Sequence, residues 1–423
     1  MNSFIKMPEV NKMLLVLPVP FRIINGKIHV EFQAHHGIRR WLDSFDRLII
    51  AAAVVPEFIA LNLTEMAWLP VDDLSSRVEF VTLPWAYRID KYIWNFLKTA
   101  SLLNKLIDDC NYLQFAIGGL WGDWAAVGAI VAQIKKRKYA IHTDRVEHEV
   151  IVRIERESGY LRRARIAIES QLMKSWHWII IRNCNLGLFH GMDTYNVYQK
   201  WMNKKGNKNH AYCIHNIHDE GLHSESKTSI DTHDNTNLNP NKVNDLSILY
   251  AGRFDATKAP LQWLKVIHNI IMNNYYIQAI WLGDGDVRKE FEQQAETLNL
   301  RSVVKTPGFI NDRTTVAQYY RSADIFLFTH ITPESPRCLL EALRFGVPIV
   351  GYESDFARDL INKNGGGILV PVGDIAALVV AVESVIKDRD LLRKLKKSAL
   401  EDGAQFTSKA VFEERSRLIK SYT

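Results

Sequence analysis

Cysteine is scarce in this chain of 423 residues, and its four copies, Cys110, Cys184, Cys213 and Cys338, form no C-x-x-C pair. This scatter fits a reducing compartment better than a disulfide framework, so the cytoplasm is the expected location. Long apolar runs are lacking too. The early stretch MLLVLPVPF carries two prolines and is far short of a membrane span or a secretory signal, so it predicts a first buried strand.

A strong excess of one charge is also missing, since the formal net charge is only +6. So mild an excess permits anionic partners such as nucleotides or lipid headgroups, and it does not indicate a nucleic-acid-binding protein. The composition, 47% hydrophobic and 24% charged, is that of a globular protein. The length favours two domains, each with its own core.

Short apolar runs alternate with longer amphipathic stretches along most of the chain. In the first half the runs RLIIAAAVV, YLQFAIGG, YAIHT and LGLFHG read as buried parallel strands. In the second half the alternation restarts with LSILYAG, IQAIWLGDG, SVVKTPGFI, ADIFLFTH, PIVGY and GGILVPV. Such alternation predicts an α/β protein in which helices cover both faces of each sheet.

Between the halves, residues 220–245 are rich in Ser, Thr, Asn, Asp and His and poor in apolar residues. A segment of this composition predicts a flexible linker. It would join two Rossmann-like, doubly wound domains, 1–219 and 246–405, that face a central cleft. Residues 406–423 are expected to form a terminal helix that crosses back to the first domain. Ligands of such sheets usually bind at the carboxyl ends of the strands.

The stretch YAGRFDATKAP places Gly252, Arg253 and Lys258 just beyond a predicted strand end. There an Arg fork and a Lys ammonium can bind a diphosphate, although a solvated basic loop is the simpler interpretation. Downstream, WLGDGDVRKEF predicts a strand, a turn at Gly283 and a helix start, which either lie beside a nucleotide base or merely close a turn.

Asp284 and Asp286 spell D-x-D, a pattern that can hold a hard cation. We interpret Asp286 instead as a helix cap and the glycines as the reason for the turn, so no metal site is predicted. His210, His215, His218 and His223 also cluster in the sequence, but no acid or Cys set completes a metal-ligand pattern.

Two carboxylates, Glu334 and Glu341, follow the strand ADIFLFTH. A pair of acids is typical of sugar hydrolysis, and an acidic, solvated helix is the simplest alternative. Ser335 and Pro336 suit the first turn of a helix, which would place Glu334 near its positive end and Glu341 about two turns further in, on roughly the same face. The two acids would then hold the hydroxyls of a sugar and a ribose.

The second half resembles the donor-binding domain of retaining glycosyltransferases of the GT-B fold, family four. Over about 170 residues the pieces follow that family's order: YAGRFDATKAP, WLGDGDVRKEF, VKTPGFI, YYRSADIFLFTH, ESPRCLLEALRFGVPIVGY and GGGILVPVGDIAAL. The resemblance implies that Arg253 and Lys258 hold the donor diphosphate, that Glu341 binds the ribose and that Glu334 contacts the donor sugar. It also places Gly252, Gly283, Ser335, Pro336, Arg337 and Leu340 in the nucleotide-sugar site.

One departure from the family concerns the spacing of the glutamates. Here six residues separate them where the family has seven, and Pro333 occupies the expected position of the first glutamate. Either the shortened loop presents the Glu334 carboxylate from an adjacent backbone position, or the role of the first glutamate passes to the main chain.

The first half resembles the acceptor domains of the same family more loosely. Gly37 would let a ligand approach the backbone, and His35 and His36 are read as loop residues. After the strand YAIHT the acceptor-side candidates are His142 and Asp144, with Asp144 preferred at the strand end.

Together these features predict a hexosyltransferase that retains anomeric configuration and needs no metal or other cofactor. Its donor would be a sugar nucleotide of UDP or GDP, and its acceptor a saccharide or a lipid-linked saccharide. Aromatic and basic residues mix in 88–110 and in the run Lys135 to Lys138, which are ordinary helix faces or contacts with the cytoplasmic membrane face. A sugar-nucleotide epimerase of the same fold and a non-catalytic sugar-nucleotide binding partner remain alternatives.

Overall fold

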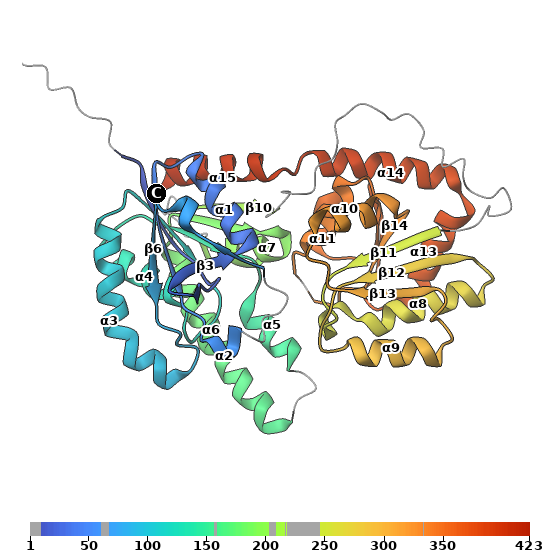
Figure 1. Cartoon of the computed structure of the whole chain (residues 1–423), viewed down its shortest axis with the longest axis horizontal. Helices are drawn as coiled ribbons and strands as arrows, with labels where there is room; N and C mark the ends of the chain where they lie inside the picture. The colour runs from blue at the N-terminus through green and yellow to red at the C-terminus, as the bar shows by residue number, and fades with distance from the viewer. Residues whose placement is uncertain are drawn as a thin grey trace, which may run out of the picture. The chain divides into compact units, whose positions relative to one another are not determined.

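The computed structural model describes residues 10–60, 67–155, 159–202, 209–215, 217, 246–332 and 334–423. By internal contacts the chain divides into two compact units, Met1–His218 with Ser408–Thr423, and Asp219–Thr407 (Figure 1). The linker expected at 220–245 lies outside the described residues.

The described part of the N-terminal unit is built on a seven-stranded parallel sheet. Its strands, in sheet order, are β10 (His210–Ile214), β9 (Leu186–His190), β8 (Ala140–Thr143), β7 (Tyr112–Ala116), β1 (Lys12–Val16), β4 (Arg47–Ala53) and β6 (Val78–Leu83). Neighbouring residues of β1 enter opposite cores, Leu14 and Val16 on one face and Met13 and Leu15 on the other. Burial on both faces explains why these strands are continuous apolar runs.

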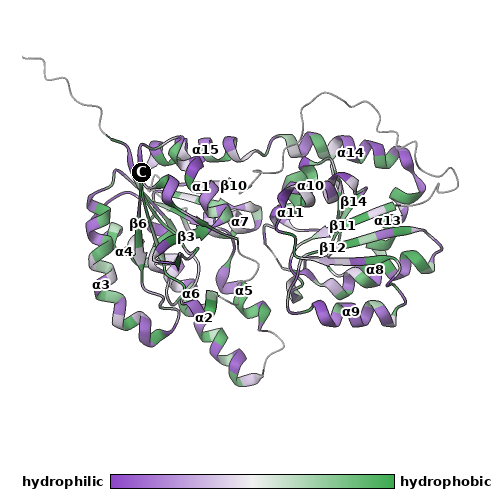
Figure 2. Cartoon of the chain, viewed as in Figure 1, coloured by the Kyte–Doolittle hydropathy of each residue, from purple (hydrophilic) through white to green (hydrophobic). Residues whose placement is uncertain are grey.

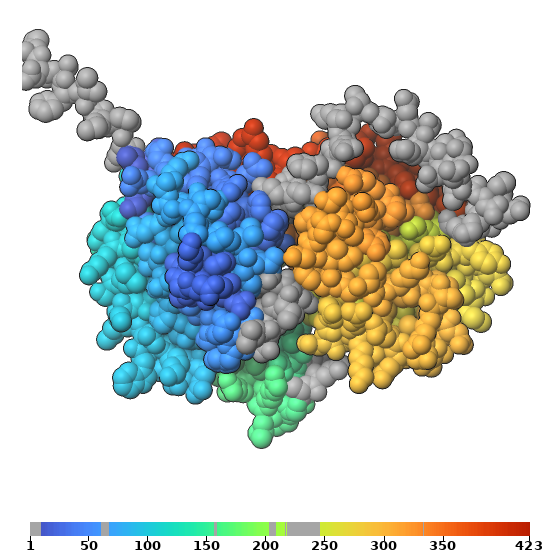
Figure 3. Space-filling model, viewed as in Figure 1, coloured from blue at the N-terminus to red at the C-terminus, as the bar shows by residue number. Residues whose placement is uncertain are grey.

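Helices cover both faces of this sheet. On one face α3 (Ile89–Asp108), α4 (Trp124–Ile134), α6 (Tyr160–Asn183) and α7 (Gly191–Met202) supply the core, and on the other α1 (Phe32–Leu42) and α15 (Ser408–Tyr422) do so. Helix α3 forms part of the outer surface of the unit (Figures 2 and 3). The shorter helices are α2 (Glu57–Ala60), η1 (Asp72–Leu74) and α5 (Glu147–Ile154).

A small antiparallel sheet of β2 (Arg22–Ile24), β3 (Lys27–Glu31) and β5 (Trp68–Pro70) adjoins α1. Glu31 ends β3 and caps α1, because its side chain accepts a hydrogen bond from the backbone N–H of Ala34. His35 and His36 therefore lie inside a helix, and their prediction as loop residues is wrong.

The C-terminal unit contains a six-stranded parallel sheet in its described part. In sheet order its strands are β13 (Val304–Gly308), β12 (Ile277–Leu282), β11 (Leu246–Ala251), β14 (Ile325–Phe328), β15 (Ile349–Tyr352) and β16 (Gly367–Val370). Its helices are η2 (Ala256–Lys258), α8 (Pro260–Met272), α9 (Arg288–Thr297), α10 (Arg313–Ser322), α11 (Arg337–Arg344), α12 (Asp355–Ile361), α13 (Ile375–Lys387) and α14 (Arg389–Ala404). The prediction of two doubly wound α/β domains is confirmed.

Within the described part of the chain, no helix is both long enough and apolar enough to cross a bilayer.

Candidate functional site

The C-terminal sheet has its topological switch point between β11 and β14. From β11 the chain proceeds outward through β12 to β13, and it then returns to β14 on the other side of β11. Ligands of open α/β sheets bind at the carboxyl ends of the strands that flank such a point. The segments that leave these two ends carry Gly252, Arg253 and Lys258 after β11, and His330 and Glu334 after β14.

Two predicted glycines lie where the ends of β11 and β12 meet. The N–H of Gly252 donates to the carbonyl of Leu282 at 2.8 Å. A Cβ atom on Gly283 would lie 2.1 Å from the carbonyl oxygen of Gly252, and Gly283 has φ +138°. Only glycine fits both the space and the backbone conformation at position 283. The backbones at the predicted residues Gly252 and Gly283 therefore lie in close approach.

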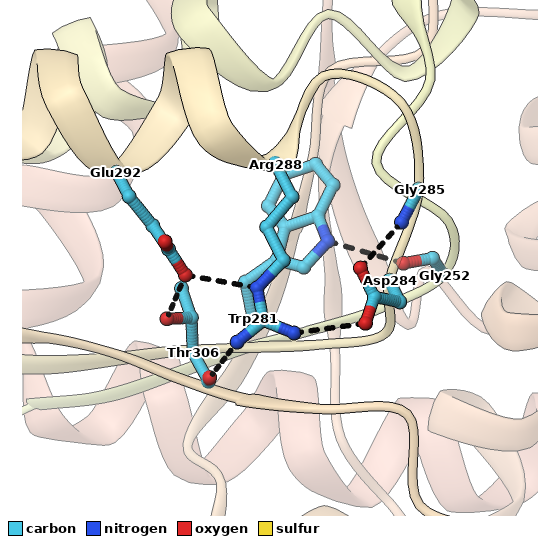
Figure 4. A network of polar contacts seen from close by, with 7 residues as sticks. All are labelled: Gly252, Trp281, Asp284, Gly285, Arg288, Glu292 and Thr306. Atoms are coloured by element: carbon cyan, nitrogen blue, oxygen red, sulfur yellow. Dashed lines mark hydrogen bonds and ion pairs between the residues drawn. The ribbon is translucent and has the colours of Figure 1, made fainter.

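The D-x-D pattern is used by the turn before α9 (Figure 4). The carboxylate of Asp284 accepts from the N–H of Gly285 and from the guanidinium of Arg288, both at 2.9 Å. Helix α9 begins at Arg288, and Val287 precedes it without a side-chain cap, so the prediction of Asp286 as a helix cap is wrong. The glycine turn is fixed by Asp284 instead, because its carboxylate reaches a cation one helical turn away.

Arg288 ties this turn to the neighbouring strand. It donates to the side chain of Glu292 at 2.8 Å and to the carbonyl of Thr306 on β13 at 3.0 Å (Figure 4). From β12 the indole of Trp281 donates to the carbonyl of Gly252 at 3.1 Å. Hydrogen bonds from β12 and from the turn before α9 thus hold the loop that follows β11 in place.

Arg253 and Lys258 differ in their surroundings. Arg253 is exposed, and its side chain forms no ion pair within the described ranges. Lys258 is only 8% exposed, and its ammonium pairs with the carboxylate of Glu334. Glu334 also accepts from the hydroxyl of Thr332 at 3.2 Å. The structure therefore brings the two predicted residues Lys258 and Glu334 into direct contact.

Helix α11 begins at Arg337, later than predicted. Pro336 precedes it with an extended backbone, ψ 118°, so Ser335 and Pro336 lie before the helix and their placement in its first turn is wrong. Glu341 is consequently about one turn into the helix rather than two. Leu340 is fully buried, so its side chain belongs to the core.

Glu341 is held by two partners that the sequence did not single out. The guanidinium of Arg313 donates to one carboxylate oxygen at 2.7 Å, and the hydroxyl of Tyr320 donates to the other at 3.1 Å. Burial raises the pKa of Tyr320 well above its usual range. Burial acts to lower the pKa of Arg313, but the charge of Glu341 and its hydrogen bond together outweigh burial, and the pKa rises. Both donors therefore stay protonated and orient the carboxylate.

A buried tyrosine and histidine lie beside the Gly252 loop. The hydroxyl of Tyr250 and Nε2 of His330 are 2.7 Å apart. Burial raises the pKa of Tyr250 and lowers the pKa of His330, each well away from its ordinary value. The pair is therefore neutral, and its hydroxyl leaves no room for a side chain at Gly252, where a Cβ would come within 2.7 Å of it.

The N-terminal sheet places the acceptor-side candidates at its own carboxyl edge. His142 is a buried residue of β8, one before its end, and its Nε2 lies 3.2 Å from a carboxylate oxygen of the more exposed Asp144. Burial lowers the pKa of His142 to about 3. Burial also lowers the pKa of Arg415 on α15 to about 10, although the charge of Asp144 acts in the opposite direction. Arg415 follows Asp144 by more than half the chain, so no local pattern connects them.

Gly37 lies within α1 on its buried side. Its acceptor-side role stays a prediction. Of the clustered histidines, His210 stacks on Tyr422 with ring centroids 3.8 Å apart, and His215 lies edge-on to His190. His218 and His223 fall outside the described residues.

Residues 232–402 match the family model for glycosyl transferases group 1. The C-terminal unit is a group 1 glycosyltransferase domain. The matched range contains the switch point, the Lys258–Glu334 ion pair and Glu341 with its two donors.

Curated relatives of this chain are similar over part of their length. The α-1,4-N-acetyl-D-galactosaminyltransferase of Campylobacter jejuni that acts on GalNAc-α-(1→4)-GalNAc-α-(1→3)-diNAcBac-PP-undecaprenol is 29% identical over 176 residues, which are 41% of this chain and 47% of that protein. The UDP-Gal:α-D-GlcNAc-diphosphoundecaprenol α-1,3-galactosyltransferase of Escherichia coli is 24% identical over 36% of this chain and 39% of its own. The chain thus spans less than half the length of the relatives it matches.

Solved structures match nearly the whole chain. HepE of Anabaena in complex with UDP has a TM-score of 0.64 at 16% identity, over 97% of this chain and 100% of that one. Sucrose-phosphate synthase of Thermosynechococcus elongatus has a TM-score of 0.66 at 14% identity, over 97% of this chain and 98% of that one. The chain has the GT-B fold.

Proposed function

We propose that the chain transfers a hexose from a nucleoside-diphosphate donor to a saccharide or lipid-linked saccharide during synthesis of a cell-surface polysaccharide, with retention of anomeric configuration. The observation that carries the proposal is the grouping of Arg253, Lys258 and the oriented Glu341 in one domain built around a topological switch point. The relatives named above act on undecaprenol-linked saccharides, and the names of both specify α-linked products. These names support the acceptor class and retention.

The proposed mechanism uses the charge that develops on the leaving diphosphate as the glycosidic bond breaks. Arg253 is exposed and available to the diphosphate, and Lys258 is fixed beside it in the same loop. Cations preorganised at the leaving group stabilise the transition state more than the ground state. Glu341 is proposed to accept hydrogen bonds from the donor ribose, because Arg313 and Tyr320 already hold its carboxylate in place.

We propose that transfer needs no metal. The two cationic side chains occupy the place where a divalent ion would otherwise neutralise a diphosphate, and Asp284 is engaged by Arg288 and by the Gly285 N–H. On the acceptor side, Asp144 is the proposed residue that meets the incoming hydroxyl, next to His142. Action at the cytoplasmic face of the membrane follows from the proposed lipid-linked acceptor.

One observation favours a second candidate, a non-catalytic sugar-nucleotide binding partner. Glu334 neutralises Lys258, a cation that a transferase would use on the diphosphate. A binder of this kind would take up the donor without releasing a nucleoside diphosphate.

The test is to incubate the chain with UDP- and GDP-hexoses, with and without an undecaprenyl-diphosphate saccharide, and to measure nucleoside diphosphate release and product mass. We expect release that depends on the acceptor and persists with a chelator. Arg253→Ala should abolish most of it, whereas the control Arg301→Ala, on an exposed turn after α9, should not. Conversion of the donor to an epimeric sugar nucleotide without acceptor would indicate an epimerase. Binding with neither conversion nor release would indicate a non-catalytic partner, and loss of release with a chelator would indicate a metal-dependent enzyme.

A further inference from the structure

Helix α3 carries a stripe of apolar side chains on its solvent face. Ile89 is 51% exposed, Ile93 65%, Trp94 86% and Leu97 80%. The opposite face of the helix already fills the core through Tyr92, Thr99, Leu103, Leu106 and Ile107. Single exposed apolar residues are ordinary on protein surfaces, but four on one face within nine residues form a patch that marks an interaction site. We call these four residues the α3 patch.

Basic residues border the α3 patch. Arg88 immediately precedes the helix, and Lys91 and Lys98 are exposed on it. The neighbouring acid Asp90 pairs with Arg88 at 3.2 Å. Three cations and one carboxylate leave two positive charges around the patch. Trp and Leu with Lys and Arg at the margin are the composition of helices that lie in the interface of an anionic bilayer.

Half of the other basic run that the sequence offered for such a contact serves the fold. Lys135 pairs with Asp108 at 2.9 Å, and Arg137 donates to the carbonyls of Ile107 at 2.8 Å and Cys110 at 2.6 Å. These contacts join the end of α4 to the end of α3. Lys135 and Arg137 are therefore held by the fold, whereas Lys136 and Lys138 are exposed. The α3 patch lies on the other, N-terminal half of α3.

The position of the α3 patch relates it to the acceptor side of the same unit. Helix α3 follows β6, and residues 84–88 lead from the carboxyl end of that strand into the patch. All strands of this sheet are parallel, so their carboxyl ends share one edge. The candidates His142, near the end of β8, and Asp144, directly after it, belong to that edge too. A bilayer that contacts the patch would lie beside the edge where an acceptor is expected.

We propose that the α3 patch docks on an anionic phospholipid bilayer. The side chains of Ile89, Ile93, Trp94 and Leu97 enter the boundary between headgroups and acyl chains, while Arg88, Lys91 and Lys98 bind lipid phosphates. Docking would bring the chain to the membrane that holds a lipid-linked acceptor, so its biological purpose rests on the proposed function. Its observations and its test are independent of transfer.

The test is co-sedimentation of the full chain with vesicles of phosphatidylcholine alone or mixed with phosphatidylglycerol. We expect binding to the mixed vesicles that weakens as salt rises. Trp94→Ser/Leu97→Ser should lower the partition coefficient by about tenfold or more. Lys91→Ala/Lys98→Ala should lower it by about fivefold for each charge removed. The matched control Tyr276→Ser/Val380→Ser removes exposed apolar side chains from the C-terminal unit and should change nothing.

Thermal melts must first show that each variant is folded. Equal binding to both kinds of vesicle, or parent-like binding by Trp94→Ser/Leu97→Ser, would overturn the proposal. A dimer that this double variant dissolves in gel filtration would assign the patch to a second copy of the chain instead. Transfer to a water-soluble acceptor without vesicle binding would refute this inference and leave the proposed function intact. Vesicle binding without transfer would support this inference and refute the proposed function.

Discussion

Arg253 and Lys258 share one loop but differ in exposure and in charge partner. Arg253 projects into solvent, while Lys258 is nearly buried and is neutralised by Glu334. Removal of Arg253 should therefore act on catalysis alone, since no folded contact depends on its side chain in the described part. Removal of either member of the Lys258–Glu334 pair should also change the free enzyme.

Arg253→Ala and Glu341→Gln should impair transfer through different kinetic constants. Without Arg253, kcat should fall on the order of 10²-fold, as when one donor to a developing anion is lost. Glu341→Gln should mainly raise the donor KM, because a ribose contact acts equally before and during reaction. Steady-state kinetics with the identified donor measure this. Thermal melts are essential for Glu341→Gln, since it leaves the half-buried Arg313 without its charge partner. If both folded variants kept the parent's kcat and donor KM, the donor site would not lie at the carboxyl edge of the C-terminal sheet.

Glu334→Gln separates two roles for that residue. If Glu334 neutralises Lys258 until a diphosphate replaces it, the variant should bind the nucleoside diphosphate without its sugar about fivefold more tightly, the effect of roughly 1 kcal/mol. If Glu334 acts only on the donor sugar, this affinity should stay unchanged while transfer falls. Calorimetric titration of parent and variant with UDP and GDP decides between the two, with Glu353→Gln as an exposed carboxylate control.

Sequence reasoning singled out Gly252, Arg253, Lys258, Gly283 and Glu341 as candidates because each belongs to a short local motif near a strand end. It missed Arg313, Tyr320 and His330, whose importance arises only when β14, α10 and α11 pack together. It also misjudged Asp286, since the choice between Asp284 and Asp286 depends on where Arg288 reaches. Contacts of this kind are fixed by tertiary packing and leave no local signature.

Helix α6 carries a histidine whose burial should make stability depend on pH. His177 is fully buried, and burial lowers its pKa to about 4. The unfolded chain therefore binds a proton that the folded chain excludes, and stability present above the ordinary histidine pKa is lost as pH falls toward the folded value. At pH 5 the loss should amount to about 2 kcal/mol for this one group.

His177→Leu should accordingly flatten the decline in stability between pH 7.5 and pH 5. The measurement is chemical denaturation of parent and variant at both values, with His36→Leu, a partly buried residue of α1, as control. Asp123, whose pKa burial raises to about 6, has the opposite effect on the slope, but it is present in every variant and cancels in the difference. Equal slopes for parent and His177→Leu would contradict the assignment.

Strands were predictable from the sequence where both faces of the sheet are buried. The strands of both large sheets are apolar runs flanked by loops, so β1, β4, β7, β8 and β9 were visible in the sequence. The small sheet of β2, β3 and β5 was not, because its residues are mostly half-exposed and β3 pairs with β5 over a long separation. Strands β2 and β3 are joined by a short turn at Asn25 and Gly26, a local signal that was overlooked. The start of α1 was missed for a similar reason, since its cap is a glutamate, Glu31, at the end of a strand.

At the scale of the whole molecule, the same strand arrangement occurs in each unit. In the N-terminal sheet the chain runs outward from β1 through β4 to β6, and it then returns to β7 on the other side of β1. The alternation of apolar and amphipathic segments predicted two doubly wound domains but could not give the strand order, which depends on the crossover of each helix. That order places each set of candidate residues at a carboxyl edge.

The most direct test of the central claim is a crystal structure of the chain with a bound nucleoside diphosphate or its hexose conjugate. We predict a diphosphate within hydrogen-bonding distance of Arg253 and Lys258, a ribose against Glu341, and a Lys258–Glu334 pair opened by the ligand. A nucleotide bound away from the carboxyl ends of β11 and β14, with these side chains unchanged, would contradict the account.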